Sequence, residues 1–192
     1  MRRQLSTLLF AGLALAASVA QTDDFHIDQV RSHADFGVRL LWVHTVTGRF
    51  TDIQGDVNLD RSGMATVDVR IGVDSVAMGS ARFRRWVLAP EFFDAARHPS
   101  ARFLSDPVPF NRLVSGGILD GQLSLRGITR PIRLELLPAD CATITARAWA
   151  WACTIEARGV VSRSDFGMTS HGTSLSDQVH LDLLIALDPT PE

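Results

Sequence analysis

The stretch Ser75–Phe103, SVAMGSARFRRWVLAPEFFDAARHPSARF, decides the fold because it places one short helix inside a series of strand-like segments. Within it, Ala81–Leu88 has apolar residues on one helical face and arginines on the other. Pro90 ends this helix, and the pair Phe92-Phe93 follows before a strand resumes. We expect the helix to cover one end of a β-structure, either as a fixed cover or as a moving lid.

The segments around this helix alternate between apolar and polar residues, as strands with one buried face do. In Thr51–Leu59 and Ala65–Val73 the odd positions are apolar or small, and the turn Arg61-Ser62-Gly63 between them predicts a hairpin. Further alternating segments are Ala34–Trp42, Leu119–Leu136, in which Pro131 is expected to begin a strand, and Val179–Leu187. Closure would remove exposed edges, so the pattern predicts an all-β, antiparallel barrel of about eight strands with one short helical insertion.

The far end of the first of these strands is apolar on both faces, because Leu41 and Val43 interrupt the alternation. This end is expected to pack either against the helix or against a second copy of the chain in a homodimer.

Four segments in a fixed order carry a family resemblance: Ser75–Phe103, ILDGQLSLRGITRPIRLEL at Ile118–Leu136, RSDFGM at Arg163–Met168, and LSDQVHLDLLIAL at Leu175–Leu187. Together they make the chain similar to the YceI-like family, periplasmic lipocalin-like barrels associated with polyisoprenoids and other long-chain lipids. The resemblance covers nearly all of the chain after the first two dozen residues. It implies a barrel that binds a long apolar ligand without a cofactor.

The family's N-terminal pattern is an Asp followed by His-Ser and an apolar strand, and it appears here as Asp28, Arg31, Ser32 and Phe36. Arg31 stands where the family has His. A role of that His is therefore not transferred, and the neighbouring His33 does not replace it.

Residues 1–20 resemble a cleaved secretory signal, with Arg2 and Arg3, an apolar stretch and small residues before Gln21. The alternative is a membrane-spanning helix, but the stretch Leu8–Val19 is short for a span of about 20 residues. We expect export to the periplasm or beyond the cell, a single mature domain over 21–192, and no membrane span after cleavage.

The composition excludes several functions. The whole chain has a formal charge of −2, and loss of the two signal arginines leaves −4, so a nucleic-acid partner is not expected. The 19 basic residues are all Arg, which excludes catalysis by a Lys Schiff base, and Tyr is absent.

Cys141 and Cys153 flank a segment rich in Ala, Thr and Trp. In an oxidising compartment they are expected to form a disulfide that closes a hairpin-like loop, stabilising the fold by about 3 kcal/mol. The alternative, a metal or redox pair, is not favoured by their spacing.

For a long isoprenoid or fatty chain we predict an apolar lining from inward parity and aromatic placement. It comprises Phe36, Val38, Leu40, Trp42, Phe92, Phe93, Phe103, Leu123, Leu125 and Phe166. The small residues Gly55, Ala65 and Gly121 are expected to leave room for the ligand. Arg82, Arg85 and Arg163 are candidate contacts for a phosphate head group, with a solvated surface position as the alternative for each.

An enzyme with a barrel pocket, such as a hydrolase or isomerase, is the second hypothesis. Its only local Ser/Asp/His cluster is Ser164, Asp165 and His171, and no G-x-S-x-G motif is present. We expect Asp165 instead to accept backbone N–H groups in a bend where Gly167 adopts a conformation that other residues avoid.

A metal centre is the third possibility. The histidines are scattered, without H-x-x-x-H or H-E-x-x-H spacing, so we expect no metal site. They are His26, His33, His44, His98, His171 and His180.

Overall fold

The computed structural model describes residues 23–41, 43–143 and 151–189. The strands are β1 (Asp23–Ile27), β2 (His33–Leu40), β3 (His44–Phe50), β4 (Ile53–Leu59), β5 (Met64–Gly72), β6 (Ala77–Met78), β7 (Ser100–Ser105), β8 (Val108–Pro109), β9 (Gly117–Leu125), β10 (Ile128–Leu136), β11 (Asp140–Thr143), β12 (Trp151–Ser162) and β13 (Leu175–Pro189). The helices are α1 (Ala81–Leu88) and α2 (Phe110–Ser115), with single 3-10 turns η1 (Val73–Ser75) and η2 (Arg163–Phe166).

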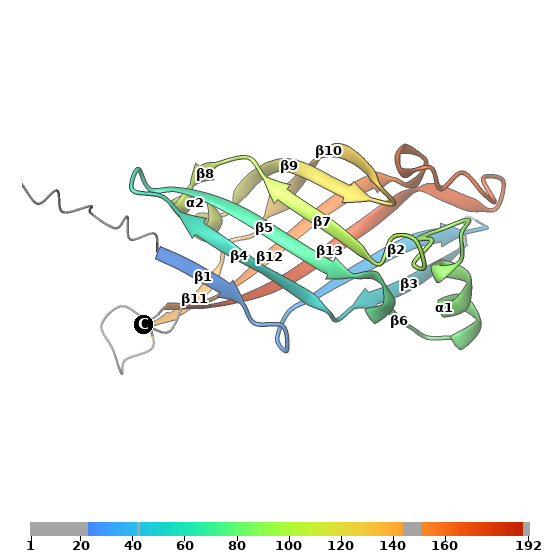
Figure 1. Ribbon diagram of the computed structural model, residues 1–192, viewed down its shortest axis with the longest axis horizontal. Coiled ribbons are helices and arrows are strands. Elements are labelled where there is room, and N and C mark those ends of the chain that lie inside the picture. The colour runs from blue at the N-terminus through green and yellow to red at the C-terminus, as the bar shows by residue number, and fades with distance from the viewer. Residues whose placement is uncertain (1–22, 42, 144–150, 190–192) are drawn as a thin grey trace, which may run out of the picture.

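Eight strands form a closed antiparallel barrel in the ring order β1, β4, β5, β7, β9, β10, β12 and β13, with β13 pairing again with β1. Figure 1 shows an elongated barrel with α1 at one end and α2 at the other. The predicted fold class is therefore confirmed.

The ring closes through the long strand β13. One of its edges pairs with β12, and the other is shared, since residues 175–184 pair with β2 and residues 187–189 pair with β1. The strands β2, β3 and β6 therefore extend the sheet beyond the ring and wrap the α1 end.

The predicted hairpin is β4–β5. Ile53 faces Ile71 and Val57 faces Val67 across the strand pair, and Ile53 and Val57 are almost fully buried. Burying each such side chain contributes about 1.5–3 kcal/mol. The sequence alternation thus corresponds directly to the inner and outer faces of the barrel.

The first predicted strand ends earlier than expected. β2 stops at Leu40, Leu41 has a left-handed φ of 51°, and the N–H of Val43 donates to the Leu40 carbonyl at 3.3 Å, so Leu41 and Val43 belong to a turn before β3. Trp42 lies outside the described residues. The alternation gave no sign of this turn because it contains none of the usual turn residues.

The helix α1 begins and ends as predicted. Ser80 caps it by accepting a hydrogen bond from the backbone N–H of Arg82, and Ala89 is extended before Pro90. The prediction of a single helix was incomplete, because α2 is a second one. It is only six residues long, has no side-chain N-cap, and ends at Gly116 with a φ of 85°.

Pro131 does not begin a strand, contrary to the prediction. β10 starts three residues earlier, at Ile128, and Pro131 lies within it opposite Gln122. β10 pairs with β12 only from Leu134 onward, so at Pro131 one side of the strand is an edge, where proline is tolerated.

Cys141 and Cys153 are directly opposite each other on β11 and β12 and form the predicted disulfide, with their Cα atoms 4.1 Å apart. The bond holds the short strand β11 on the barrel. The segment 144–150 between them lies outside the described residues.

Arg31, the departure from the family pattern, has a structural role. Its guanidinium donates hydrogen bonds to the carboxylates of Asp28 and Asp188, tying the β1–β2 turn to the end of β13. The hydrogen bond from Arg31 holds the pKa of Asp28 below its usual value.

The predicted signal, residues 1–20, and the domain's limits at 21 and 192 also fall outside the described residues. No helix within the described ranges is long and apolar enough to cross a membrane.

Candidate apolar ligand cavity

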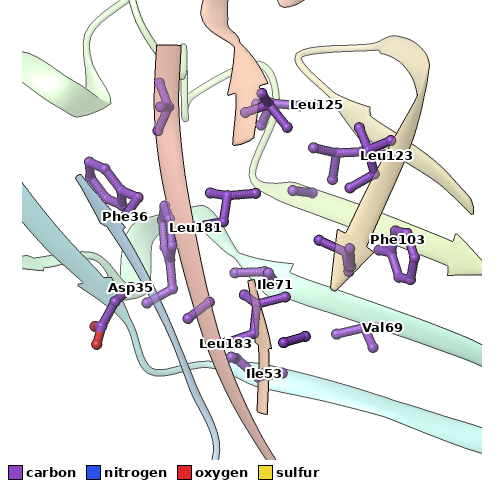
Figure 2. A pocket seen from close by; sticks show the side chains of 18 of the residues that line it. Asp35, Phe36, Ile53, Val69, Ile71, Phe103, Leu123, Leu125, Leu181 and Leu183 are labelled. Carbon is purple, nitrogen blue, oxygen red and sulfur yellow. The ribbon is translucent and has the colours of Figure 1, made fainter. Parts of the chain in front are cut away.

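An internal cavity of about 200 Å³ runs along the barrel. Inward-facing side chains of the ring strands other than β1, and of β2 and β3, line it, from Trp86 and Phe92 at the α1 end to Leu113 and Leu136 at the α2 end. Figure 2 shows the aliphatic and aromatic side chains converging on this space.

The alternation of β13 explains why the lining is apolar. Val179, Leu181, Leu183, Ile185 and Leu187 all face the cavity, because successive residues of a strand point to opposite faces. The same rule applies to β12, where Ile155, Ala157 and Val161 line the cavity; these three residues were not predicted, although the alternation of β12 indicates them.

The α2 end is closed by packed apolar side chains. Leu113 of α2 is 1% exposed, and Phe110 stacks on Phe25 with the ring centroids 5.6 Å apart. This end of the cavity is therefore sealed by the core.

An aromatic cap, which we define as Trp86, Phe92 and His171, lies at the α1 end, where Trp86 and Phe92 line the cavity. The centroids of Trp86 and Phe92 are 4.5 Å apart, and the His171 ring lies parallel to Phe92 at 6.0 Å. His171 has a φ of 59° and comes from the loop before β13. Ring contacts within the cap thus join α1 to that loop.

Two charged residues contribute to the lining, Asp35 and Arg163. The Asp35 carboxylate points away from the apolar side chains in Figure 2 and accepts hydrogen bonds of 2.6 and 2.7 Å from Arg49 on the outer face. The hydrogen bonds from Arg49 hold the pKa of Asp35 below its usual value. Asp35 is therefore paired on the outside of the barrel and presents no free charge to the cavity.

Arg163, a predicted head-group contact, is 4% exposed and its guanidinium is engaged within the protein. Its Nε donates to the carbonyl of Ser176 at 2.9 Å, Nη1 donates to those of Ser170 (2.8 Å) and Met168, and Nη2 donates to that of Leu175 (3.2 Å). These four bonds fix the loop before β13 over the barrel end. The Arg163 guanidinium therefore binds the carbonyls of this loop, and little of its hydrogen-bonding capacity remains for a ligand.

Most of the predicted lining residues do line the cavity: Phe36, Val38, Phe92, Phe93, Phe103, Leu123 and Leu125. Leu40, the last residue of β2, does not, although Leu175 opposite it does; the β2–β13 register shifts between Leu175 and Val179. Phe166 does not either. From the turn η2 it packs in a buried cluster with Ala101, Leu125 and Met168, three residues that do line the cavity.

The predicted small residues leave no room for a ligand, since Gly55, Ala65 and Gly121 are absent from the lining. A Cβ at Gly121 would lie 2.7 Å from the Phe103 ring, so that ring occupies the space. At Gly121 the prediction failed because an aromatic ring from the neighbouring strand fills the space beside the glycine.

The other two predicted head-group residues, Arg82 and Arg85, are exposed on the outer face of α1 and do not line the cavity. The structure therefore does not bring the three arginines together at one site.

The Ser/Asp/His cluster is not assembled as a catalytic group. The Ser164 hydroxyl donates to Asp177 at 2.9 Å, and His171 packs in the aromatic cap. Asp177, not the predicted Asp165, accepts the backbone N–H of Ser164, and Gly167 has the expected positive φ of 75°.

Within residues 23–41, 43–143 and 151–189, no group of three or more His, Cys, Asp or Glu side chains is arranged to hold a metal ion.

The fold and the cavity define a class of protein: closed antiparallel barrels with an apolar interior. The YceI-like domain family matches residues 25–187 of the chain, and the protein belongs to that family. Protein YceI of Escherichia coli O157:H7 is 29% identical over 195 aligned residues, covering 98% of this chain and 97% of the relative. The UPF0312 protein VPA0850 of Vibrio parahaemolyticus is 33% identical over 138 residues, covering 67% of this chain and 71% of the relative.

Two solved structures share the fold. Burkholderia cenocepacia BcnA superposes with a TM-score of 0.67 at 17% identity, covering 83% of this chain and 98% of that protein. A polyisoprenoid binding domain from Saccharophagus degradans, implicated in plant cell wall breakdown, superposes with a TM-score of 0.64 at 15% identity, covering 86% and 98%.

Proposed function

We propose that the barrel binds one long apolar chain, an isoprenoid or a fatty-acid derivative, and that the protein is a periplasmic carrier, store or sensor of that ligand. The observation that carries this proposal is the continuous apolar cavity in which both charged lining residues are already paired within the protein.

The cavity favours a slender ligand. Its volume of about 200 Å³ lies below the range of about 300–1,000 Å³ that is usual for compact drug-sized ligands. A single chain lying along the barrel suits an elongated space of this size better than a fused ring system does. Side chains at the cavity ends would have to move to admit a long chain.

Burial of the chain supplies enough free energy for useful affinity once side chains move to admit it. At about 0.8 kcal/mol per methylene, a fully buried chain of twenty carbons gives roughly 16 kcal/mol before the costs of association and ordering are subtracted. A head group then needs only to fix the orientation.

Family membership and the disulfide support the ligand class and the compartment. The Saccharophagus degradans domain, which shares the fold, is described as binding polyisoprenoid. The disulfide fits an oxidising compartment, as does the predicted secretory signal.

Two adjacent residues of β12 provide a matched test. Val161 lines the cavity, whereas Val160 is 50% exposed on the outer face. Val161→Trp should displace about three methylenes of the ligand and weaken its binding about fiftyfold, and Val160→Trp should leave it unchanged.

The measurement is native mass spectrometry of protein purified without detergent, followed by titration of the delipidated protein with a fluorescent fatty-acid analogue. A lipid adduct released intact on denaturation is expected, since the proposal assigns binding and not turnover. Absence of any bound lipid together with equal affinities for the two variants would refute a ligand in this cavity.

A further inference from the structure

The β2–β3 turn exposes two large apolar side chains at the α1 end of the barrel. Leu41 is 59% exposed and Val43 is 79% exposed. In the described part of the chain the other exposed large apolar residues, such as Val30 and Val160, occur singly, which is normal for a protein surface. Leu41 and Val43 together form a small exposed apolar tip.

The backbone of this tip is fixed in a conformation that does not suit its residues. Leu41 has a left-handed φ of 51°, and its N–H donates to the Ser174 carbonyl at 2.6 Å. Asn, Asp or Gly fits that conformation better than Leu does. An apolar side chain is therefore held toward solvent where local sterics favour a small polar one.

Exposed arginines lie at the same end of the barrel. Figure 1 shows the β2–β3 hairpin, α1 and the loop before β13 together there. Among the described residues, the guanidinium groups of Arg82 and Arg85 make no hydrogen bond or ion pair, whereas wall arginines such as Arg49 and Arg102 are paired with aspartates. Asp74 and Glu91 are also exposed on this segment, so the positive charge is local to the outer face of α1.

We propose that this end of the barrel docks on an anionic lipid bilayer. Leu41 and Val43 insert among the acyl chains at the interface, and Arg82 and Arg85 bind lipid phosphates, which guanidinium groups can contact with two hydrogen bonds. Trp86 and Phe92 of the aromatic cap line the cavity at this same end, so docking places that end of the cavity against the membrane. The inference goes beyond the proposed function because docking requires no ligand in the cavity.

A second copy of the chain is a weaker candidate for the tip. The surface that two turn residues can bury is far smaller than the roughly 800 Å² per partner of a stable interface. A two-fold dimer would also place the same surface against itself, bringing the unpaired arginines of α1 close to those of the partner.

The experiment is a flotation assay with vesicles of phosphatidylglycerol and phosphatidylethanolamine, compared with phosphatidylcholine alone, all free of isoprenoid. The protein should bind the anionic vesicles, and added salt should weaken that binding because it screens the attraction between the arginines and the lipid phosphates. Arg82→Ser with Arg85→Ser should weaken partition about 25-fold, at about fivefold per arginine. Leu41→Asn with Val43→Ser should weaken it about tenfold.

Two exposed residues away from α1 provide matched controls. Arg61 lies in the β4–β5 turn at the α2 end, and Val30 is 94% exposed in the β1–β2 turn. Arg61→Ser and Val30→Ser should leave partition unchanged. Thermal unfolding of every variant checks that the fold is retained.

The proposal is wrong if the wild-type protein does not bind anionic vesicles. It is also wrong if the variants of the tip and of α1 bind the vesicles no worse than the control variants do. Conversion of a dimer to a monomer by Leu41→Asn with Val43→Ser, without vesicle binding, would assign the tip to a second copy. If a variant does not fold, hydrogen exchange of the wild-type protein with and without vesicles replaces that variant. Vesicles should then protect the backbone amides of the β2–β3 turn and α1. Protection confined to other segments would refute docking. Lipid recovered by mass spectrometry despite failed docking would leave the cavity function standing.

Discussion

Replacing Arg163 by Lys separates its structural role from a role in ligand binding, because the positive charge is kept. The guanidinium donates to four carbonyls from three nitrogens, whereas an ammonium group has three donors on one atom. At least one carbonyl must lose its partner, and the bonds to Met168 and Leu175 are buried.

Each buried carbonyl without a donor costs about 1–3 kcal/mol. With one or two of them affected, Arg163→Lys should lower the free energy of unfolding by about 2–4 kcal/mol. For a domain of this size that corresponds to a fall in Tm of about 5–15 °C.

Urea denaturation followed by tryptophan fluorescence measures the change. The control is Arg158→Lys, since Arg158 is exposed on the outer face of β12 and its ion pair with Asp182 is 3.3 Å long. That variant should stay within about 0.5 kcal/mol of wild type. If Arg163→Lys also stays within that limit but loses affinity for lipid, the carbonyl bonds are not the main role of Arg163 and the head-group hypothesis is correct.

Three further predictions concern stability. Hydrogen bonds from Arg102 lower the pKa of Asp68 below its unfolded value. Their contribution to the free energy of unfolding is therefore present above about pH 4 and is lost as pH falls through the folded pKa. In urea titrations, Asp68→Asn should reduce the loss of stability between neutral pH and about pH 3. Gly48→Ala would place a Cβ 2.5 Å from the Phe36 ring and should cost about 1–3 kcal/mol, whereas Gly79→Ala, with no atom within 4 Å, should be neutral in the same assay. Replacing both disulfide cysteines by alanine should cost about 3 kcal/mol at a separation of 12 residues, and a change below 1 kcal/mol would mean that the hairpin does not need the bond.

The strands were predictable because a barrel wall with one buried face imposes a period of two on its sequence. The same rule places Phe36, Phe103 and Leu123 on the cavity wall, where the structure has them. It failed at Leu41, where the turn is formed by an apolar residue in a left-handed conformation.

The rest of the site depends on contacts between distant segments. Parity has no meaning for Phe166 in a 3-10 turn, and nothing local shows that the Arg163 side chain folds back on the carbonyls of the following loop. Gly121 appeared to leave space because the Phe103 ring that fills it belongs to another strand. Sequence patterns thus predict which face a residue lies on, but not which neighbour occupies that face.

The sharing of β13 among three partners also governs the order in which the protein can fold. Phe25 near the start of the described chain pairs with Pro189 at its end, and β2 and β12 use the same final strand. During synthesis these three earlier strands each lack a neighbour until the last segment emerges, and long-range pairings of this kind form slowly. Unpaired edges bind other strands readily, so the interval before β13 docks is when the newly made chain is most prone to aggregate and most dependent on chaperones.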